Sequence, residues 1–170
     1  MIKIIDNFFE NKKYNQIINH IKTNIFFKAQ YLNEKSEKSE ENYYGDRFVL
    51  EEDENLLKMF IKQSENKFKI KIKKLTSASI DIRNLKNFFP HTDTREGNKL
   101  NIFIMLDGPV GVTTGIVFYT NNELDMHVGF RPNRALLFPS DKLHSPHKSD
   151  LKGIRRYTST LFIKEYGELI

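Results

Sequence analysis

Two histidines and one aspartate stand at spacings that suit a metal ion. His91 and Asp93 are separated by one residue, Thr92. Residues i and i+2 at the end of a strand point to the same side, so these two can offer one nitrogen and one oxygen to the same ion. His144 follows a later predicted strand and turn, residues 133–140. Two histidines and one carboxylate on one face of an ion leave adjacent coordination positions open, which suits the oxygen chemistry of non-haem iron(II).

A pair of arginines begins the next predicted strand. Arg155 and Arg156 directly precede Tyr157. Because neighbours on a strand face opposite ways, we expect one arginine to be a solvated surface charge and the other to face the site. A guanidinium near the ion can bind the far carboxylate of a two-acid co-substrate through a bidentate pair.

Other residues compete for these roles. His147 lies three residues after His144 and could reach the ion instead. His127 is the first reserve ligand, although a position on a strand surface suits it better. Asp93 taken alone would be interpreted as a turn or cap residue. For Arg83, the sequence favours neither of two alternatives, a position that lines a pocket beside the metal and a solvated position.

The size of the chain and its lack of cysteine narrow the possible sites. With 170 residues and 20.1 kDa, it has the size of one domain with a single core. It contains no cysteine, which excludes disulfides, zinc–thiolate sites, iron–sulfur clusters and thiol nucleophiles. Any metal must therefore be held by histidine nitrogen and carboxylate oxygen.

The charge pattern does not indicate a nucleic-acid surface. The net charge is +5 and the sequence pI is about 9.2, but the lysines are scattered among acidic residues. The densest run, residues 67–75 (KFKIKIKKL), alternates lysine with apolar residues. This alternation predicts a strand with one buried and one solvated face. We therefore do not expect nucleic acid as a partner.

Apolar stretches are too short for a membrane span. The longest include residues 102–106, and a spanning helix needs about 20 apolar residues. The N-terminal residues contain Asp6 and lack the long apolar segment of a signal peptide. We expect a cytoplasmic protein without a membrane partner.

The N-terminal part predicts an edge strand and two helices. Residues 1–5 suit the strand, and residues 33–45 are polar and predict a flexible loop. Asp53 is the expected N-cap of the second helix. The residues expected on buried helix faces are Tyr14, Ile17, Ile18 and Ile21, and then Leu56, Leu57, Phe60 and Ile61. His20 falls off the first of these faces, so we expect it to be exposed.

From Phe68 onward, the hydrophobic pattern has period two. Turn signals such as Asp107–Gly108–Pro109 separate short strands. The predicted strands include residues 77–82, 99–106, 111–119, 134–139 and 156–163. Together they indicate a mainly β, α+β protein whose strands form a β-sandwich, jelly roll or barrel, with the helices packed on one sheet.

Four segments, in this order, resemble the iron(II)- and 2-oxoglutarate-dependent oxygenases. The chain looks most like the small prolyl-4-hydroxylase-like members found in bacteria and phages. The segments are HTD at 91–93, NIFIMLD at 101–107, GIVFY at 115–119, and NRALLFPSDKLHS (133–145) through RRYTSTLF (155–162). They span a little over half of the chain, and the FPS-x-x-x-H spacing favours His144 over His147.

The resemblance implies a fold and a set of site residues. The fold is a double-stranded β-helix over residues 76–165, supported by residues 1–75 within one domain of residues 1–170. The implied metal ligands are His91, Asp93 and His144. The implied co-substrate residues are Arg156 with Thr158, Arg155 as the alternative arginine, and Asn101, which stands on the strand where many relatives carry a tyrosine.

The implied activity is that of an iron(II)- and 2-oxoglutarate-dependent dioxygenase. Such an enzyme consumes O2 and 2-oxoglutarate, releases succinate and CO2, and hydroxylates an unactivated C–H bond of a peptidyl or small-molecule substrate. One rival is a cupin-like β-barrel that binds a metal or small molecule without oxygenase activity. Cupins favour His-x-His and a glutamate, whereas this chain has His-x-Asp and a downstream arginine. A second rival, a basic binding module, requires a Lys/Arg stripe that the sequence lacks.

Overall fold

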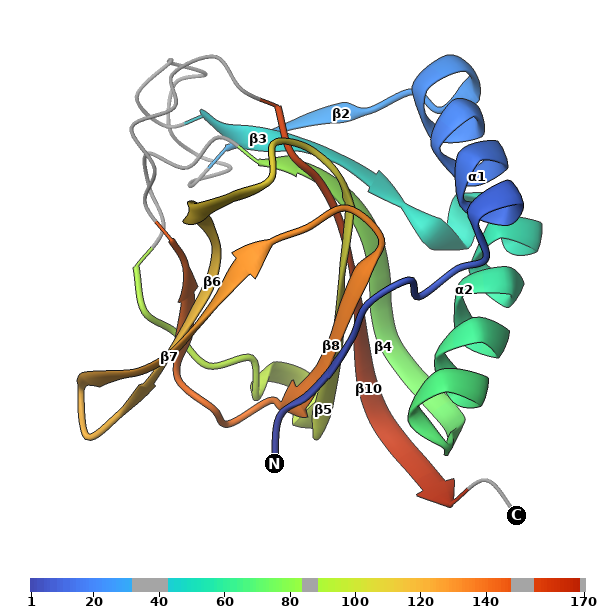
Figure 1. The fold of residues 1–170 in the computed structure, drawn as a ribbon. Coiled ribbons are helices and arrows are strands. Elements are labelled where there is room, and N and C mark those ends of the chain that lie inside the picture. Colours follow the sequence, from blue (N-terminus) through green and yellow to red (C-terminus); the bar gives the residue numbers. More distant parts are fainter. Residues whose placement is uncertain (32–42, 84–88, 148–154, 169–170) are drawn as a thin grey trace.

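The protein consists of two antiparallel sheets and two helices (Figure 1). The computed structural model describes residues 1–31, 43–83, 89–147 and 155–168. The strands are β1 (Lys3–Ile5), β2 (Lys28–Tyr31), β3 (Tyr43–Val49), β4 (Ile70–Arg83), β5 (Leu100–Asp107), β6 (Gly111–Thr120), β7 (Glu123–Phe130), β8 (Arg134–Pro139), β9 (His144–Pro146) and β10 (Tyr157–Glu168). The helices are α1 (Asn11–Asn24) and α2 (Glu54–Phe68), and two 3-10 turns are η1 (Leu50–Glu52) and η3 (Arg95–Gly97).

The larger sheet has the strand order β1-β8-β5-β10-β4-β3-β2, and the smaller sheet has the order β7-β6-β9. The helices cover one face of the larger sheet, while β6 and β7 lie on the side opposite to them (Figure 1). This arrangement confirms the predicted mainly β jelly roll with N-terminal helices packed on one sheet. The predicted edge strand at the N-terminus is also confirmed, because β1 pairs with β8 at the end of the larger sheet.

Both helices bury the faces that their sequences predict. Ile17 and Ile21 of α1 are buried, because apolar residues spaced three and four apart form one stripe of a helix. At the start of α2, the Asp53 carboxylate accepts a hydrogen bond of 3.0 Å from the backbone N–H of Leu56, as an N-cap does. The predicted second helix and its cap are therefore confirmed.

The strand predicted over residues 67–75 begins later than expected. Residues 67 and 68 form the last turn of α2, and β4 begins at Ile70. Phe68 is spaced four residues from Ser64 and eight from Phe60, so it joins the buried face of the helix. Lys69 then takes a left-handed conformation (φ 58°) and ends the helix. The alternation of lysine and apolar residues therefore holds only from residue 70 onward.

Strands β2, β3 and β9 were not among those predicted. Tyr43–Gly45, at the end of the predicted loop, belong to β3, which pairs with both β2 and β4. Residues 33–42 of that loop lie outside the described residues. In the smaller sheet, β7 and β9 flank β6. Strand β4 also crosses the expected boundary between residues 75 and 76, so the two parts of the chain share one sheet.

Two apolar clusters stabilise the layers. The larger cluster lies between the helices and the larger sheet, and its buried members include Phe60, Ile80, Ile104 and Leu161. The smaller cluster lies between the sheets and is formed by Met105, Ile116, Phe118, Val128, Phe130, Leu136 and Phe138. Burying these side chains is the main source of stability for such a layered fold.

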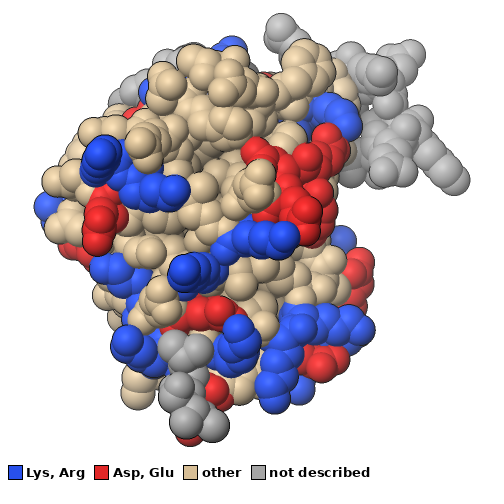
Figure 2. All heavy atoms as spheres, turned by 90° about the vertical axis from the view of Figure 1, so that its right-hand side faces the viewer, with Lys and Arg blue, Asp and Glu red and all other residues tan. Residues whose placement is uncertain are grey.

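The helix-covered side of the molecule carries charges of both signs. Lysine and arginine lie among aspartate and glutamate there, without a single-sign stripe (Figure 2). In the described part of the chain, no helix is both long and apolar enough to cross a membrane.

Candidate metal centre

The backbone brings the two predicted histidine ligands together. The N–H of His91 donates to the carbonyl of His144 at 2.9 Å, and the N–H of His144 donates back at 3.0 Å. The N–H of Asp93 donates to the carbonyl of Ser140 at 2.8 Å. His91 and His144, which are 53 positions apart in sequence (144 − 91), are thereby joined in a short antiparallel bridge.

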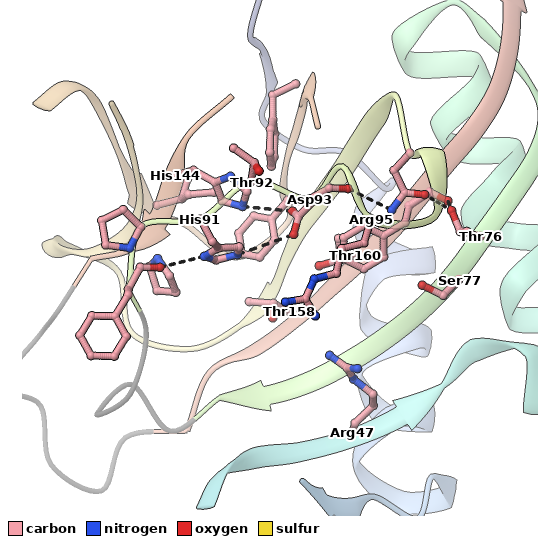
Figure 3. A pocket seen from close by; sticks show the side chains of 18 of the residues that line it. Arg47, Thr76, Ser77, His91, Thr92, Asp93, Arg95, His144, Thr158 and Thr160 are labelled. Carbon is pink, nitrogen blue, oxygen red and sulfur yellow. Dashed lines mark hydrogen bonds and ion pairs between the residues drawn. The ribbon is translucent and has the colours of Figure 1, made fainter. Parts of the chain in front are cut away.

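The three side chains converge on one point (Figure 3). Ligand atoms from His91, Asp93 and His144 all lie within 4.8 Å of one another. The Nε2 atom of His144 is 3.2 Å from Oδ2 of Asp93, and Nε2 of His91 is 3.7 Å from Oδ1. Two imidazoles and one carboxylate at such separations match the donor set expected for a non-haem iron(II) site.

Hydrogen bonds fix which nitrogen of each ring faces the centre. Nδ1 of His91 is 2.8 Å from the carbonyl oxygen of Phe89, and Nδ1 of His144 is 2.9 Å from that of Lys142. A carbonyl can only accept, so each Nδ1 carries a proton and donates it. In the neutral rings, both Nε2 atoms then present lone pairs beside a carboxylate. Three convergent acceptors require a cation between them, and the set therefore fits a divalent metal.

The carboxylate of Asp93 is held from behind by Asn101. The Asn101 amide donates to Oδ2 of Asp93 at 2.6 Å, and its own carbonyl oxygen accepts from the Ser140 hydroxyl at 3.0 Å. Burial by itself would raise the pKa of Asp93. With no metal bound and both imidazoles protonated, the hydrogen bond and charge of His144, the charge of His91 and the Asn101 amide lower it on balance. The carboxylate is thus kept ionised for a metal.

This contact changes the role expected for Asn101. Its side chain is fully buried, and it is absent from the described lining of the adjoining cavity. The amide is engaged by Asp93 and Ser140, which gives Asn101 the role of holding a metal ligand, and its expected contact with a co-substrate stays a prediction. The β5 residue that does line the cavity is Phe103.

Aromatic rings shield the inner histidine. His144 is only 6% exposed, and its ring packs 4.9 Å from that of Phe138 and 6.1 Å from that of Phe118, between centroids. The metal-facing nitrogen thus sits against an apolar wall, where electrostatic interactions are stronger than in water.

Gly115 allows strands β6 and β7 of the smaller sheet to pack closely against each other next to the candidate metal centre. Gly115 has φ 118°, and a Cβ at this position would overlap the carbonyl oxygen of Val128. Only glycine accepts both the conformation and the close approach of β7.

A cavity of about 700 Å³ opens next to the three ligands. Arg156, Thr158 and Thr160 line it from β10 and the residue before that strand, and they alternate with residues that do not line it. Both threonines are buried. The predicted ligands and the predicted co-substrate residues Arg156 and Thr158 are therefore walls of one cavity.

Arg156 carries an unneutralised charge inside this cavity. It is 5% exposed, and it forms neither an ion pair nor a hydrogen bond with any residue that the structure describes. Its guanidinium carbon lies 5.6 Å from the centre of the Phe130 ring. Burial lowers its pKa to about 10, which leaves the group charged at neutral pH. A bound anion would remove the cost of burying this cation without a counter-ion among the described residues.

Arg155 faces away from the cavity. It is exposed and absent from the described cavity lining. The alternation predicted for the two arginines thus places Arg156, and not Arg155, on the cavity side.

The reserve histidines lie apart from the three convergent ligands. The rings of His127 and His147 stack on each other with centroids 4.6 Å apart, and Nε2 of His127 is 3.0 Å from the carbonyl oxygen of Thr114. His20 is partly exposed and pairs with Asp53 at 2.9 Å. The side chain of Arg83 lies outside the described residues.

Two further charged residues of the cavity wall were not predicted from the sequence. Arg47 lines it from β3, and Arg95 lines it from η3. Neither residue belongs to a motif. Arg95 follows His91 by four positions, so its place next to the predicted ligands could have identified it from the sequence. Arg47 could not be identified in this way, because it reaches the cavity through the pairing of β3 with β4.

Searches with the sequence alone identify no relative. No protein-family sequence model matches the chain, and no curated protein sequence is significantly similar to it.

Comparison of structures gives clear matches. HygX from Streptomyces hygroscopicus, solved with nickel, 2-oxoglutarate and hygromycin B, has a TM-score of 0.67 at 9% identity, over 98% of this chain and 82% of HygX. A Pseudomonas putida prolyl-4-hydroxylase has a TM-score of 0.65 at 8% identity, over 96% and 92%. A Trichoplax adhaerens prolyl hydroxylase in complex with a hypoxia inducible factor peptide fragment has a TM-score of 0.57 at 14% identity, over 96% and 83%. At these identities the comparison shows the fold, so the resemblance to the 2-oxoglutarate and iron(II) oxygenases is confirmed as a likeness of fold.

Proposed function

We propose that this protein is an iron(II)- and 2-oxoglutarate-dependent dioxygenase of the prolyl-hydroxylase-like type, which hydroxylates an unactivated C–H bond. The observation that carries the proposal is the pairing of two sites in one cavity. Three acceptor atoms that require a cation lie on one side, and the buried, unneutralised Arg156 lies on the same cavity wall. A keto acid with a second carboxylate satisfies both sites at once.

Each protein group has a distinct task in this proposal. His91 and His144 present Nε2 to the metal because their Nδ1–H groups are held by backbone carbonyls. Asn101 fixes the ligand Asp93. Arg156 binds the distal carboxylate of 2-oxoglutarate, and the Thr158 hydroxyl is on the same face to share it. When bound, iron(II) supplies the activation of O2 that accompanies decarboxylation of 2-oxoglutarate to succinate.

The burial of Arg156 also argues against the alternative function, that of a cupin-like barrel that only binds a metal or small molecule. A barrel that only holds a metal has no use for a charge that costs several kcal/mol to bury without a partner. The proposed substrate is peptidyl or a small molecule. The solved structures of similar fold support that range, since one holds a peptide fragment and another holds hygromycin B. A cytoplasmic location and a single domain over residues 1–170 belong to the same proposal.

Anaerobic addition of iron(II) and 2-oxoglutarate tests the function. The protein is expected to develop the weak visible charge-transfer band of a keto-acid chelate, and His91→Ala is expected to abolish it. Arg156→Met should raise the 2-oxoglutarate concentration for half-maximal absorbance by roughly tenfold to a hundredfold, because it removes a charge-assisted pair. The melting temperature of Arg156→Met should not fall, because the variant also removes an unpaired buried charge.

Arg131→Met is the matched control. Arg131 is half-exposed and pairs with Asp6 at 3.2 Å, and it does not belong to the cavity lining. The control should form the band with unchanged 2-oxoglutarate affinity. A folded wild-type protein that forms no band, with circular dichroism confirming its structure, would exclude the oxygenase proposal.

A further inference from the structure

The guanidinium of Arg156 has no polar anchor among the described residues, although it is buried. An arginine side chain has many rotamers, and fixing them when a ligand binds weakens the affinity. A polar anchor would restrict these rotamers beforehand. In the part of the chain that the structure describes, packing against apolar surface must serve that purpose instead.

The ring of Phe130 lies against this guanidinium. The central carbon of the guanidinium is 5.6 Å from the ring centre, and a cation over an aromatic face is attracted by the ring quadrupole. Phe130 is itself only 2% exposed, because it belongs to the apolar cluster between the two sheets. The ring is therefore a fixed surface on which the charged end of Arg156 can rest.

Gly108 makes room for both side chains. A Cβ at this position would lie 3.0 Å from Cγ of Arg156 and 3.1 Å from the nearest carbon of the Phe130 ring. The residue also has φ 152°, a conformation that favours glycine. Any larger residue here would have to displace the arginine stem or the ring.

The three residues meet where the two sheets join. Gly108 follows β5 of the larger sheet directly after Asp107, and Asp107 pairs with Tyr157. Arg156 directly precedes Tyr157, and Phe130 is the last residue of β7 in the smaller sheet. The position of the Arg156 side chain thus depends on contacts from both sheets.

We propose that Phe130 and Gly108 are positioning residues that hold the Arg156 guanidinium in place for the distal carboxylate of 2-oxoglutarate. The identity of this anion rests on the proposed function. The ring contact exists before any ligand binds, so it adds no new contact on binding. Its benefit is that the rotamers of Arg156 are already restricted, and less entropy is lost when the carboxylate binds.

A double-mutant cycle on 2-oxoglutarate affinity tests the proposal. Phe130→Leu removes the ring and keeps an apolar side chain in the cluster. The 2-oxoglutarate concentration for half-maximal chelate absorbance should rise about twofold to tenfold, the effect of one newly mobile long side chain. In the Arg156→Met background, the same substitution should have no effect on affinity, because no cation remains to be positioned.

Val128→Ala is the matched control. Val128 is two residues before Phe130 on the same strand, is 5% exposed, and belongs to the same apolar cluster. It does not belong to the described cavity lining, so the variant should lose stability and keep the wild-type affinity for 2-oxoglutarate. Gly108→Ala tests the seat from a second residue, and it should also weaken 2-oxoglutarate only while Arg156 is present.

Nuclear magnetic resonance of the metal-free protein tests the positioning without any ligand. The Nε–H signal of Arg156 is identified by its absence in Arg156→Met. In the wild type its relaxation should report a rigid group on the picosecond to nanosecond timescale, and in Phe130→Leu a mobile one. The ring current should also shift the wild-type signal upfield relative to the variant.

Three results would contradict the positioning role. One is an affinity loss from Phe130→Leu that is equally large in Arg156→Met, which would show a general loosening of the cavity. Another is an equal loss in Val128→Ala. The third is an Arg156 Nε–H group that is already mobile in the wild type. A wild-type protein without a chelate band refutes the proposed function instead, and the relaxation measurement still decides whether Phe130 holds Arg156.

Discussion

The two faces of the seven-stranded sheet use the same strands for different purposes. On β10, Leu161 and Ile163 are fully buried in the cluster beneath the helices, whereas Thr158 and Thr160 line the cavity. The period of two along a strand separates these sets. One strand can therefore contribute to the core with one residue and to the candidate site with the next.

The same division holds where β3 pairs with β4. Phe48 and Ile80 pair across the strands and face the helices, while Arg47 and Asp81 pair on the cavity side. The residues that stabilise the fold and the residues that line the candidate site therefore lie on different faces of the same strands. Substitutions of apolar residues on the outer face should change mainly the free energy of unfolding, and substitutions of the residues that line the cavity should change mainly ligand affinity.

The largest effect is expected on the outer face. Leu161→Ala should lower the free energy of unfolding by about 2–5 kcal/mol, because it removes a fully buried side chain and leaves a cavity. Urea denaturation measures the loss. The 2-oxoglutarate affinity of the folded variant should stay within about twofold of wild type, and a tenfold change would show that the two faces are coupled.

The next largest effect is expected on the inner face, at the residue that holds the carboxylate of Asp93. Asn101→Ala should weaken iron(II) binding by about 10- to 100-fold, because residues that orient metal ligands typically contribute that much to affinity. Anaerobic metal titration measures it. Asn98→Ala is the matched control, since the Asn98 side chain contacts the backbone carbonyl of Asp93, at 3.1 Å, and the Thr76 hydroxyl, but not the Asp93 carboxylate. Equal losses in both variants would contradict a specific role for the carboxylate contact.

The smallest effect compares two serines on opposite faces. The Ser159 hydroxyl is buried without a hydrogen-bond partner in the described structure, so Ser159→Ala should raise the free energy of unfolding by about 1 kcal/mol. Ser79→Ala should lower it by a similar amount, because Ser79 donates to the buried Asp81. Chemical denaturation of both variants checks the opposite signs, and a loss in Ser159→Ala would show that the hydroxyl is bonded.

Local patterns were sufficient for much of the site. The spacing of His91 and Asp93, and the alternation of Arg155 with Arg156, are properties of neighbouring residues on one strand, so they can be predicted without knowing the fold. The cap at Asp53 is equally local. Phe68 was misassigned because its position fits both the helical spacing before it and the strand alternation after it.

The sequence alone determined the types of ligand, their order along the chain and the faces of the main helices. Tertiary structure decided the rest. In the folded protein, the Asn101 amide donates to Asp93, and Arg156 is the arginine that is buried. Arg47 lies in the cavity wall because β3 pairs with β4. These outcomes depend on which strands become neighbours and how far a side chain is buried, and both are set by contacts between residues that are distant in sequence.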